Sequence, residues 1–566
     1  MRFFDKLGLT KKNQLKRNVF LNIVTVLFVL LALFLLISGI GKIWGMFHRE
    51  NKTEKAQRIW EEEVYEVGSD QVQKAFTEAE IALWGEETSI TKIVEWQLEN
   101  LKEVYVWEEE LDSCKEAELI FVSRKNLTTA EIKILNRYIK EGKNIFFTEL
   151  PSEEALKNFS VKKLLGIRSY QGIQKKTGIR LNDQVLFDKV AELKEPFELK
   201  SVTLQQRTEV YASALEKEKK KDEELAPLFW KYQRERGCGY VYAADAYMMG
   251  SSTGAAIISF LFTDIHKAYM YPIVNAYCFA IAGIPYSENF TSSYLEEEFE
   301  RDSLNVQNDI FFPEFRRCEA RYEVPATWYQ SEEREEKKEN LILEYYLDEI
   351  EKENGELGQM INEEAVAQCR FPNRLTEWSS AFTWKSEDNT VQVPYQLMEK
   401  KKYQDIIYRQ NVLQKAAGIT CIYVDMKSHL YGTEDSQSWI DFCMNLESVL
   451  GTDRQDQPWL DRVTVSEAIY RILSMEMLQP EITYEAAGNS REEAQDRELW
   501  NEEKIAGTLY NFTGKAYFYL SLPGDGQIEK TKGIRVEKIG DRLYLAEAYT
   551  EEFEILYKTK VIFDKQ

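Results

Sequence analysis

The alternation of apolar and polar residues predicts two α/β units followed by an all-β tail. In residues 68–290, short apolar runs such as AELIFVS (117–123) alternate with stretches in which apolar residues recur at helical spacing. One such helix begins at the capping box of Thr128 and Glu131 and is closed by Gly142. The order strand, helix, strand indicates a parallel sheet covered by helices.

The second unit, residues 295–480, repeats this alternation. It contains the strand-like runs EVPATWY (323–329) and GITCIYVDM (418–426), each followed by a helical pattern. From residue 495 to 566 the pattern changes to short strands of alternating apolar and polar residues, broken by Gly-Asp turns. That pattern predicts antiparallel strands, arranged as a β-sandwich.

The N-terminus departs from the globular pattern. Residues 19–41 carry no charge, and about 20 such residues span a bilayer as a helix. The stretch 1–18 holds six Lys and Arg against one Asp, and basic flanks stay in the cytoplasm. The sequence therefore predicts a cytoplasmic tail (1–18), a transmembrane helix (19–41), a stalk (42–67) and an extracytoplasmic bulk. The predicted location is the cell membrane, with a single pass.

Charge and composition narrow the functional classes. The net charge is −23, and removing the +5 of the stretch 1–18 leaves −28 on the remainder. Such acidity argues against nucleic-acid binding and tolerates a cationic partner such as an amino-sugar polymer. The seven cysteines form no C-x-x-C pair, which indicates neither a zinc ribbon nor a disulfide scaffold. With only His48, His266 and His429 in the chain, chemistry based on histidine is not expected.

The first α/β unit resembles the flavodoxin-like sheet of class I glutamine amidotransferase-like domains. The resemblance rests on LTTAEIKILNRYIKEGKNIFFTE (127–149) and APLFWKYQRERGCGYVYAADAYM (226–248). An active member needs a Cys on a strand-to-helix turn together with a His and an acid. Cys238 precedes its strand, and Ser123 has no evident His partner, so catalysis is not expected here. The helix start MMGSSTGAA (248–256) presents free N–H groups that suit an anion, as helix starts generally do.

The second unit resembles the polysaccharide deacetylase barrel of carbohydrate esterases. The matching text is RYEVPATWYQ and NGELGQM (354–360), then GITCIYVDMKSHLYG and PWLDRVTVSEAIYRI (458–472). The resemblance implies a (β/α) barrel that hydrolyses N-acetyl groups of a sugar polymer. In the family, one Asp and two His hold a divalent metal, a second Asp acts as base and a His as acid.

The metal ligands of that family are absent from the matching positions. After ELG, where two histidines are expected, the chain has Gln359, Met360, Ile361, Asn362 and Glu363. The prediction is a barrel without a metal site and without a cofactor. The nearest stand-ins for its catalytic groups are Asp302 or Asp309, Arg370, Asp425 and His429.

Three aromatic residues in the middle of this unit are candidates for substrate binding, because sugar faces stack on such rings. They are Trp378, Trp384 and Tyr395, and core packing explains them nearly as well.

The order of the three domains is similar to that of a bacterial family found with Pel-type exopolysaccharide export systems. The resemblance implies a membrane-anchored protein that binds or scaffolds a cell-surface polysaccharide without catalysis. One alternative is an active, zinc-dependent N-deacetylase with a rearranged site. Another is an adaptor that docks onto a membrane polysaccharide synthase or export complex.

Overall fold

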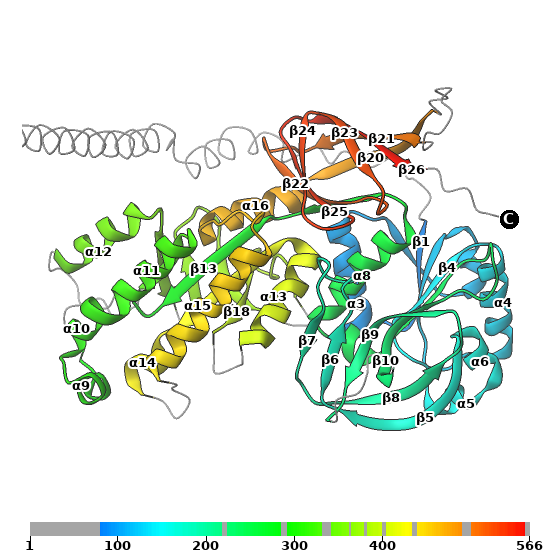
Figure 1. The fold of residues 1–566 in the computed structure, drawn as a ribbon, viewed down its shortest axis with the longest axis horizontal. Coiled ribbons are helices and arrows are strands. Elements are labelled where there is room, and N and C mark those ends of the chain that lie inside the picture. The colour runs from blue at the N-terminus through cyan, green and yellow to red at the C-terminus, as the bar shows by residue number, and fades with distance from the viewer. Residues whose placement is uncertain are drawn as a thin grey trace, which may run out of the picture. The chain divides into compact units, whose positions relative to one another are not determined.

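The computed structural model describes nine segments of the chain, and all of them belong to one compact unit that begins at residue 67 (Figure 1). The described residues are 80–217, 224–284, 291–330, 341–361, 364–378, 382–398, 403–432, 438–488 and 500–560.

The first part of the chain forms a mixed sheet of nine described strands in the order β2-β1-β3-β4-β11-β10-β9-β6-β7. The first five are parallel and follow the order 2-1-3-4-5 that flavodoxin-like sheets share. The other four are antiparallel extensions. The strands are β1 (Ile81–Gly85), β2 (Tyr105–Glu108), β3 (Leu119–Ser123), β4 (Asn144–Phe147), β6 (Gly178–Leu181), β7 (Ala191–Leu193), β9 (Thr208–Leu215), β10 (Ala226–Tyr232) and β11 (Val241–Ala244).

Helices and a two-stranded ribbon complete this part. The capping box predicted at Thr128 is present, because its hydroxyl accepts from the Glu131 N–H and the Glu131 carboxylate accepts from the Thr128 N–H at 2.7 Å. Gly142 follows the helix with a φ of 97°, a conformation that favours glycine. The elements are α3 (Ser89–Leu101), α4 (Thr129–Lys140), α5 (Glu153–Lys157), α6 (Phe159–Leu164), β5 (Ile167–Lys176), β8 (Phe197–Leu204), α7 (Ala246–Met249) and α8 (Ser252–Ile265).

The second part forms a sheet of seven described strands in the order β16-β15-β14-β13-β19-β18-β17. Its strands curve into a nearly closed barrel, since the edge strands β16 and β17 approach each other. The Asn373 amide joins the two edges, accepting from the Ala367 N–H at 2.8 Å and donating to its carbonyl at 3.0 Å. The strands are β13 (Ala276–Ala282), β14 (Ala326–Gln330), β15 (Glu356–Ile361), β16 (Glu364–Ala367), β17 (Asn373–Glu377), β18 (Val391–Leu397) and β19 (Ile419–Asp425).

Helices pack on the outside of this barrel, where Phe279, Trp328 and Ile422 point into a shared apolar core. The helices are α9 (Ser293–Phe299), α10 (Ser303–Val306), α11 (Phe312–Tyr322), α12 (Leu341–Lys352), α13 (Tyr403–Ala417), α14 (Lys427–Tyr431), α15 (Trp439–Asp456) and α16 (Val465–Met477).

The chain ends in two four-stranded antiparallel sheets with a common apolar core. One of them recruits β12 (Tyr269–Ile273), which pairs with β22 although it lies far earlier in the chain. Asn275 turns the backbone between β12 and β13 with a φ of 53°. The remaining strands are β20 (Gln479–Gly488), β21 (Trp500–Tyr510), β22 (Ala516–Ser521), β23 (Gln527–Lys532), β24 (Ile534–Lys538), β25 (Leu543–Ala548) and β26 (Glu552–Lys560).

The predicted fold class is wrong in containing a transmembrane helix. Among the described residues, no helix is both long enough and apolar enough to cross a membrane. The apolar helix α8 has 14 residues, about 21 Å against a hydrocarbon core of about 30 Å. Helix α15 has 18 residues but carries charged side chains such as Asp441 and Glu447.

The predicted span 19–41, the tail 1–18 and the stalk 42–67 lie outside the described residues. The fold class is corrected to a mixed α/β fold, and the single-pass membrane location inferred from the span is corrected with it.

All seven cysteines are free thiols. Cys114, Cys278, Cys318 and Cys421 are buried, and the other three are half-buried.

Candidate functional site

The carboxyl ends of the parallel barrel strands bring the predicted site region together at one edge. Gln330 at the end of β14 is the register partner of Gln359 on β15. Asp425 ends β19 beside Ala282 of β13. The edge therefore carries two amides and one exposed carboxylate within four neighbouring strands.

Tyr395, on β18, stands at the same side of the barrel. It is half-buried, and its ring centroid lies 4.7 Å from that of Tyr423 on β19. Its carbonyl accepts a hydrogen bond from the Trp378 N–H at 3.2 Å. Of the three aromatic candidates for substrate binding, Tyr395 is the one whose side chain is partly open to solvent.

The structure explains why a glycine, Gly358, stands in the ELG stretch. The ring of Tyr329 covers Gly358, so that a Cβ there would lie 2.5 Å from ring carbons. Tyr329 is buried, and its hydroxyl has no hydrogen-bond partner. Of the five residues that follow Gly358, Gln359–Ile361 belong to β15, while Asn362 and Glu363 lie outside the described residues.

His429, on the short helix α14, has apolar surroundings. The side chain is buried, with ring centroids 4.7 Å from Phe442 and 5.6 Å from Trp439. Burial lowers the pKa of His429 to about 4. Asp425, in contrast, is exposed and accepts from the Lys427 N–H at 2.9 Å. The two candidates thus occupy different surroundings.

The remaining catalytic candidates sit at the surface. Asp302 is the N-cap of α10 and accepts from the Asn305 N–H at 2.9 Å. Asp309 is paired with Arg301 at 3.0 Å. Arg370 is exposed in the bend after β16. In the part of the chain that the structure describes, no group of three or more His, Cys, Asp or Glu is placed to hold a metal ion.

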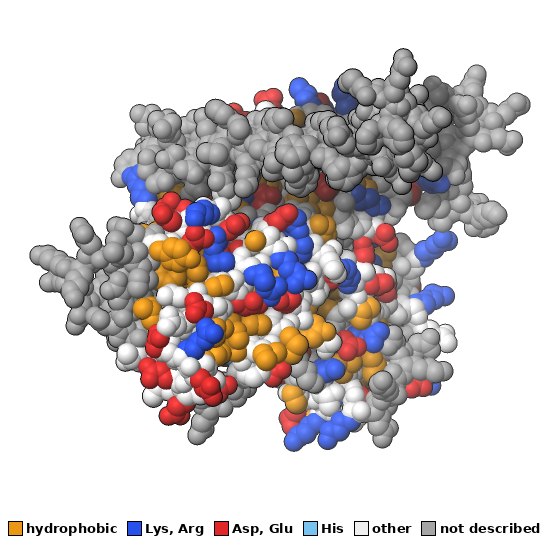
Figure 2. All heavy atoms as spheres, turned by 60° about the vertical axis from the view of Figure 1, so that its left-hand side comes forward, with side chains coloured by type: hydrophobic (Ala, Val, Ile, Leu, Met, Phe, Trp, Pro, Cys, Tyr) orange, Lys and Arg blue, Asp and Glu red, His pale blue; other side chains and the backbone are white. Residues whose placement is uncertain are grey.

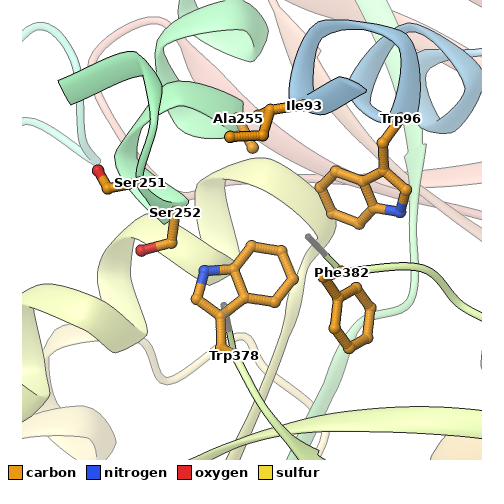
Figure 3. A pocket seen from close by; sticks show the side chains of 7 residues that line it. All are labelled: Ile93, Trp96, Ser251, Ser252, Ala255, Trp378 and Phe382. Atoms are coloured by element: carbon orange, nitrogen blue, oxygen red, sulfur yellow. The ribbon is translucent and has the colours of Figure 1, made fainter. Parts of the chain in front are cut away.

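Trp384 and Trp378 belong to a cluster of rings between the barrel and helix α3. Trp384 is buried and donates from Nε1 to the Asn100 side chain at 2.6 Å. The ring of Trp96, on α3, lies 5.3 Å from Trp378 and 5.8 Å from Trp384. Phe382 completes the cluster, 4.9 Å from Trp378 (Figure 3). Trp384 is therefore packed as core, whereas Trp378 also lines a small cavity.

The two nucleophile candidates of the first α/β part, Ser123 and Cys238, lie in buried or half-buried positions. Ser123 ends β3 and is buried, with a hydroxyl that has no partner. Cys238 is half-buried in the turn before β11. His266 follows α8 and stacks on Phe262 and Tyr269, and burial lowers its pKa.

A second cavity lies where α7, α8, α13 and β7 meet. Its volume is about 330 Å³, and its walls include Leu193, Tyr247, Ser252, Tyr408 and Arg409. The sequence reasoning missed this site, because its walls come from segments that are far apart along the chain. The helix start MMGSSTGAA was the one signal that pointed to it.

The charge of the chain is not gathered on the face seen in Figure 2. There, Lys and Arg side chains lie interspersed with Asp and Glu among the described residues. The net charge of −23 thus gives this face no single acidic patch that would select a cationic partner.

Comparison with known proteins gives weak likenesses. No protein-family model matches the chain, and no curated protein matches it. Among solved structures, an exo-β-1,4-mannosidase from Opitutaceae bacterium strain TAV5 is 16% identical at a TM-score of 0.21, covering 32% of each chain. A β-galactosidase from Rahnella sp. R3 is 10% identical at 0.24, covering 35% of this chain and 34% of its own.

PurLQS from Thermotoga maritima is 12% identical at a TM-score of 0.18, over 28% of this chain and 84% of the other. This chain spans about a third of the mannosidase and the galactosidase. Likenesses of this extent carry no argument about function, and the resemblance to polysaccharide deacetylases stays a prediction.

Proposed function

We propose that this protein binds a polysaccharide chain at the carboxyl edge of its barrel and does not hydrolyse it. The observation that carries the proposal is the adjacency of three of the four stretches that resemble polysaccharide deacetylases. They lie on β14, β15 and β19. Strands β14 and β19 flank β13, β15 pairs with β14, and all of these strands run parallel. Strand ends that meet at one edge are where barrels of this kind place their ligands.

The chemistry of the edge supports a neutral sugar ligand. The exposed Gln359 offers an amide donor and acceptor, and the exposed Asp425 offers a carboxylate. Tyr395 presents a half-buried ring, and such rings stack on the apolar faces of sugars while polar groups bind the hydroxyls. Both kinds of contact are available on adjacent strands.

The placement of His429 disfavours the alternative of a rearranged deacetylase. A general acid must carry a transferable proton and reach the leaving group. With a pKa of about 4, His429 is neutral at pH 7, and it lies among Trp439 and Phe442. In the family pattern, the first metal-binding His comes two residues after the Gly of ELG, and there this chain has the thioether Met360.

The test is binding of the full chain to soluble chitin oligosaccharides and to their deacetylated, cationic counterparts, at low and high salt. We expect the chain to bind the neutral oligomers at both salt concentrations. High salt screens exposed charges, so binding that persists there does not depend on charge. Tyr395→Ala should weaken binding about tenfold, whereas Tyr549→Ala, an exposed Tyr on the β-sandwich, should leave it unchanged.

Two results would count against the proposal. One is equal binding by the Tyr395→Ala variant, or none by the native chain. The other is release of acetate together with one bound zinc per chain, which would favour the deacetylase instead.

A further inference from the structure

The N-terminus of helix α8 faces two cavities that share Ser251 and Ser252. Ser251 caps the helix, its hydroxyl accepting from the Thr253 N–H at 3.3 Å and its carbonyl from the Gly254 N–H at 3.0 Å. The N–H of Ser252, the first helical residue, has no acceptor within the helix. This 14-residue helix directs the positive end of its dipole at the same point.

A second, independent donor is aimed at that point. Trp378 is 6% exposed, and its Nε1 is buried without a hydrogen-bond partner. In Figure 3 the indole nitrogen of Trp378 lies on the side of the ring that faces Ser251 and Ser252. The space beside it measures about 10 Å³, which accommodates about one oxygen atom. A buried N–H left unpaired is costly, so a ligand acceptor would stabilise this arrangement.

The larger cavity supplies a cation and an apolar wall on the other side of the two serines. Arg409 and Glu195 both line it, and the Arg409 Nη2 lies 3.1 Å from the Glu195 carboxylate, so a ligand phosphate must share this guanidinium with Glu195. Tyr247 lines it as well, its ring stacked on Phe197 at 4.2 Å. Burial and the nearby Glu195 raise the pKa of Tyr247 to about 12, so the phenol stays neutral. At about 330 Å³ the cavity is within the range of small-molecule sites.

We propose that this cavity binds a phosphate monoester of a small ring compound, with the phosphate at the start of α8. Ser252, Trp378 and Arg409 present donors from three different elements. A phosphate offers three acceptor oxygens to such a set, and helix N-termini with a guanidinium favour it. The ring then lies against Tyr247 and Leu193 in the larger cavity. This site is separate from the glycan-binding edge and does not depend on it.

The test is calorimetric titration of the full chain with glucose 6-phosphate and with AMP. Glucose, adenosine and inorganic phosphate serve as the comparison compounds. We expect at least one of the two esters to bind at least tenfold more tightly than its neutral parent and than inorganic phosphate. Equal affinity for ester and parent, or no binding of either ester at millimolar concentration, would overturn the proposal.

Two variants locate the site. Ser252→Asp places a negative charge at the first helical position, where acidic side chains stabilise a helix, so the variant should still fold. The same charge repels a phosphate, so the affinity for the ester should fall tenfold or more. Trp378→Phe keeps a ring but removes the N–H, and should also lose about tenfold.

The matched control is Trp84→Phe, because Trp84 is a buried Trp whose nitrogen also lacks a partner but which lines neither cavity. This variant should bind as the native chain does. Unchanged affinity in both Ser252→Asp and Trp378→Phe would contradict the assignment.

Discussion

At the scale of single residues, two buried groups give opposite pH dependences. Asp453 is enclosed, its Oδ2 accepting from the Tyr277 hydroxyl at 2.9 Å and from the Gln410 amide at 2.8 Å. Burial raises the pKa of Asp453 to about 7, so the folded chain holds this proton after the unfolded chain has released it near pH 4. The free energy of unfolding therefore falls as pH rises from about 4 to about 7. His429 does the reverse, because its folded pKa of about 4 lies below the ordinary value.

Replacing Asp453 by Asn should remove the first of these dependences. The amide oxygen can still accept from Tyr277 and Gln410, so little changes at pH 4. Above pH 7 the variant should be more stable than the native chain by a few kcal/mol, since it buries no charge. Urea unfolding of both proteins from pH 4 to pH 8 measures the difference. A difference that stays constant across this range would contradict the assigned titration.

A second residue-scale prediction concerns Gly358. Because the Tyr329 ring covers it, Gly358→Ala should lower the free energy of unfolding by about 1–3 kcal/mol. Gly524→Ala is the matched control, since an added Cβ there meets only Arg542 at 3.9 Å. Urea unfolding of the two variants is the measurement, and equal losses would argue against the close packing.

At the scale of elements, patterns within one segment predicted helices and strands well, whereas contacts between distant segments could not be predicted from the sequence. The cap of α4 and the buried strand β3 follow from local spacing, and the structure has both. The run YMYPIVNAYCFAIA (269–282) is apolar almost throughout, so its pattern of apolar and polar residues does not show where β12 ends and β13 begins. Only Asn275, in a left-handed conformation, divides it.

The candidate site was predictable to the same extent. The run GITCIYVDM was predicted as a strand, so the place of Asp425 near a strand end was predictable, whereas its position at the same edge as Gln359 was not. The core role of Trp384 was not predictable, since its partner Asn100 lies 284 residues away. The cavity at α8 was hidden for the same reason.

At the scale of the whole molecule, the aromatic cluster joins the first sheet to the barrel. Trp384 donates a hydrogen bond to the side chain of Asn100 on α3. Strand β12, which comes early in the chain, pairs with β22 in a C-terminal sheet. Gln97 of α3 reaches the Ala416 carbonyl of α13 at 2.8 Å. These contacts bury polar groups of one part against another, so the parts should unfold together.

Trp384→Phe tests this coupling. The variant leaves the side-chain oxygen Oδ1 of Asn100 buried without its donor, at a cost of about 1–3 kcal/mol. We expect one cooperative transition, shifted to lower denaturant, by both fluorescence and circular dichroism. Trp96→Phe breaks no hydrogen bond of its indole and should cost less. Two separated transitions in the native chain would show that the parts unfold independently.

The pairing of β12 with β22 also determines how late during synthesis of the chain this sheet can form. Strand β12 ends at Ile273 and β22 begins at Ala516, so the whole barrel must be translated between them. At a synthesis rate of about 5–20 residues per second, that interval is roughly 10–50 s. For that time the nascent chain carries a bare strand edge beside the central barrel strand, and an early ribosomal stop would leave it permanently exposed to aggregation.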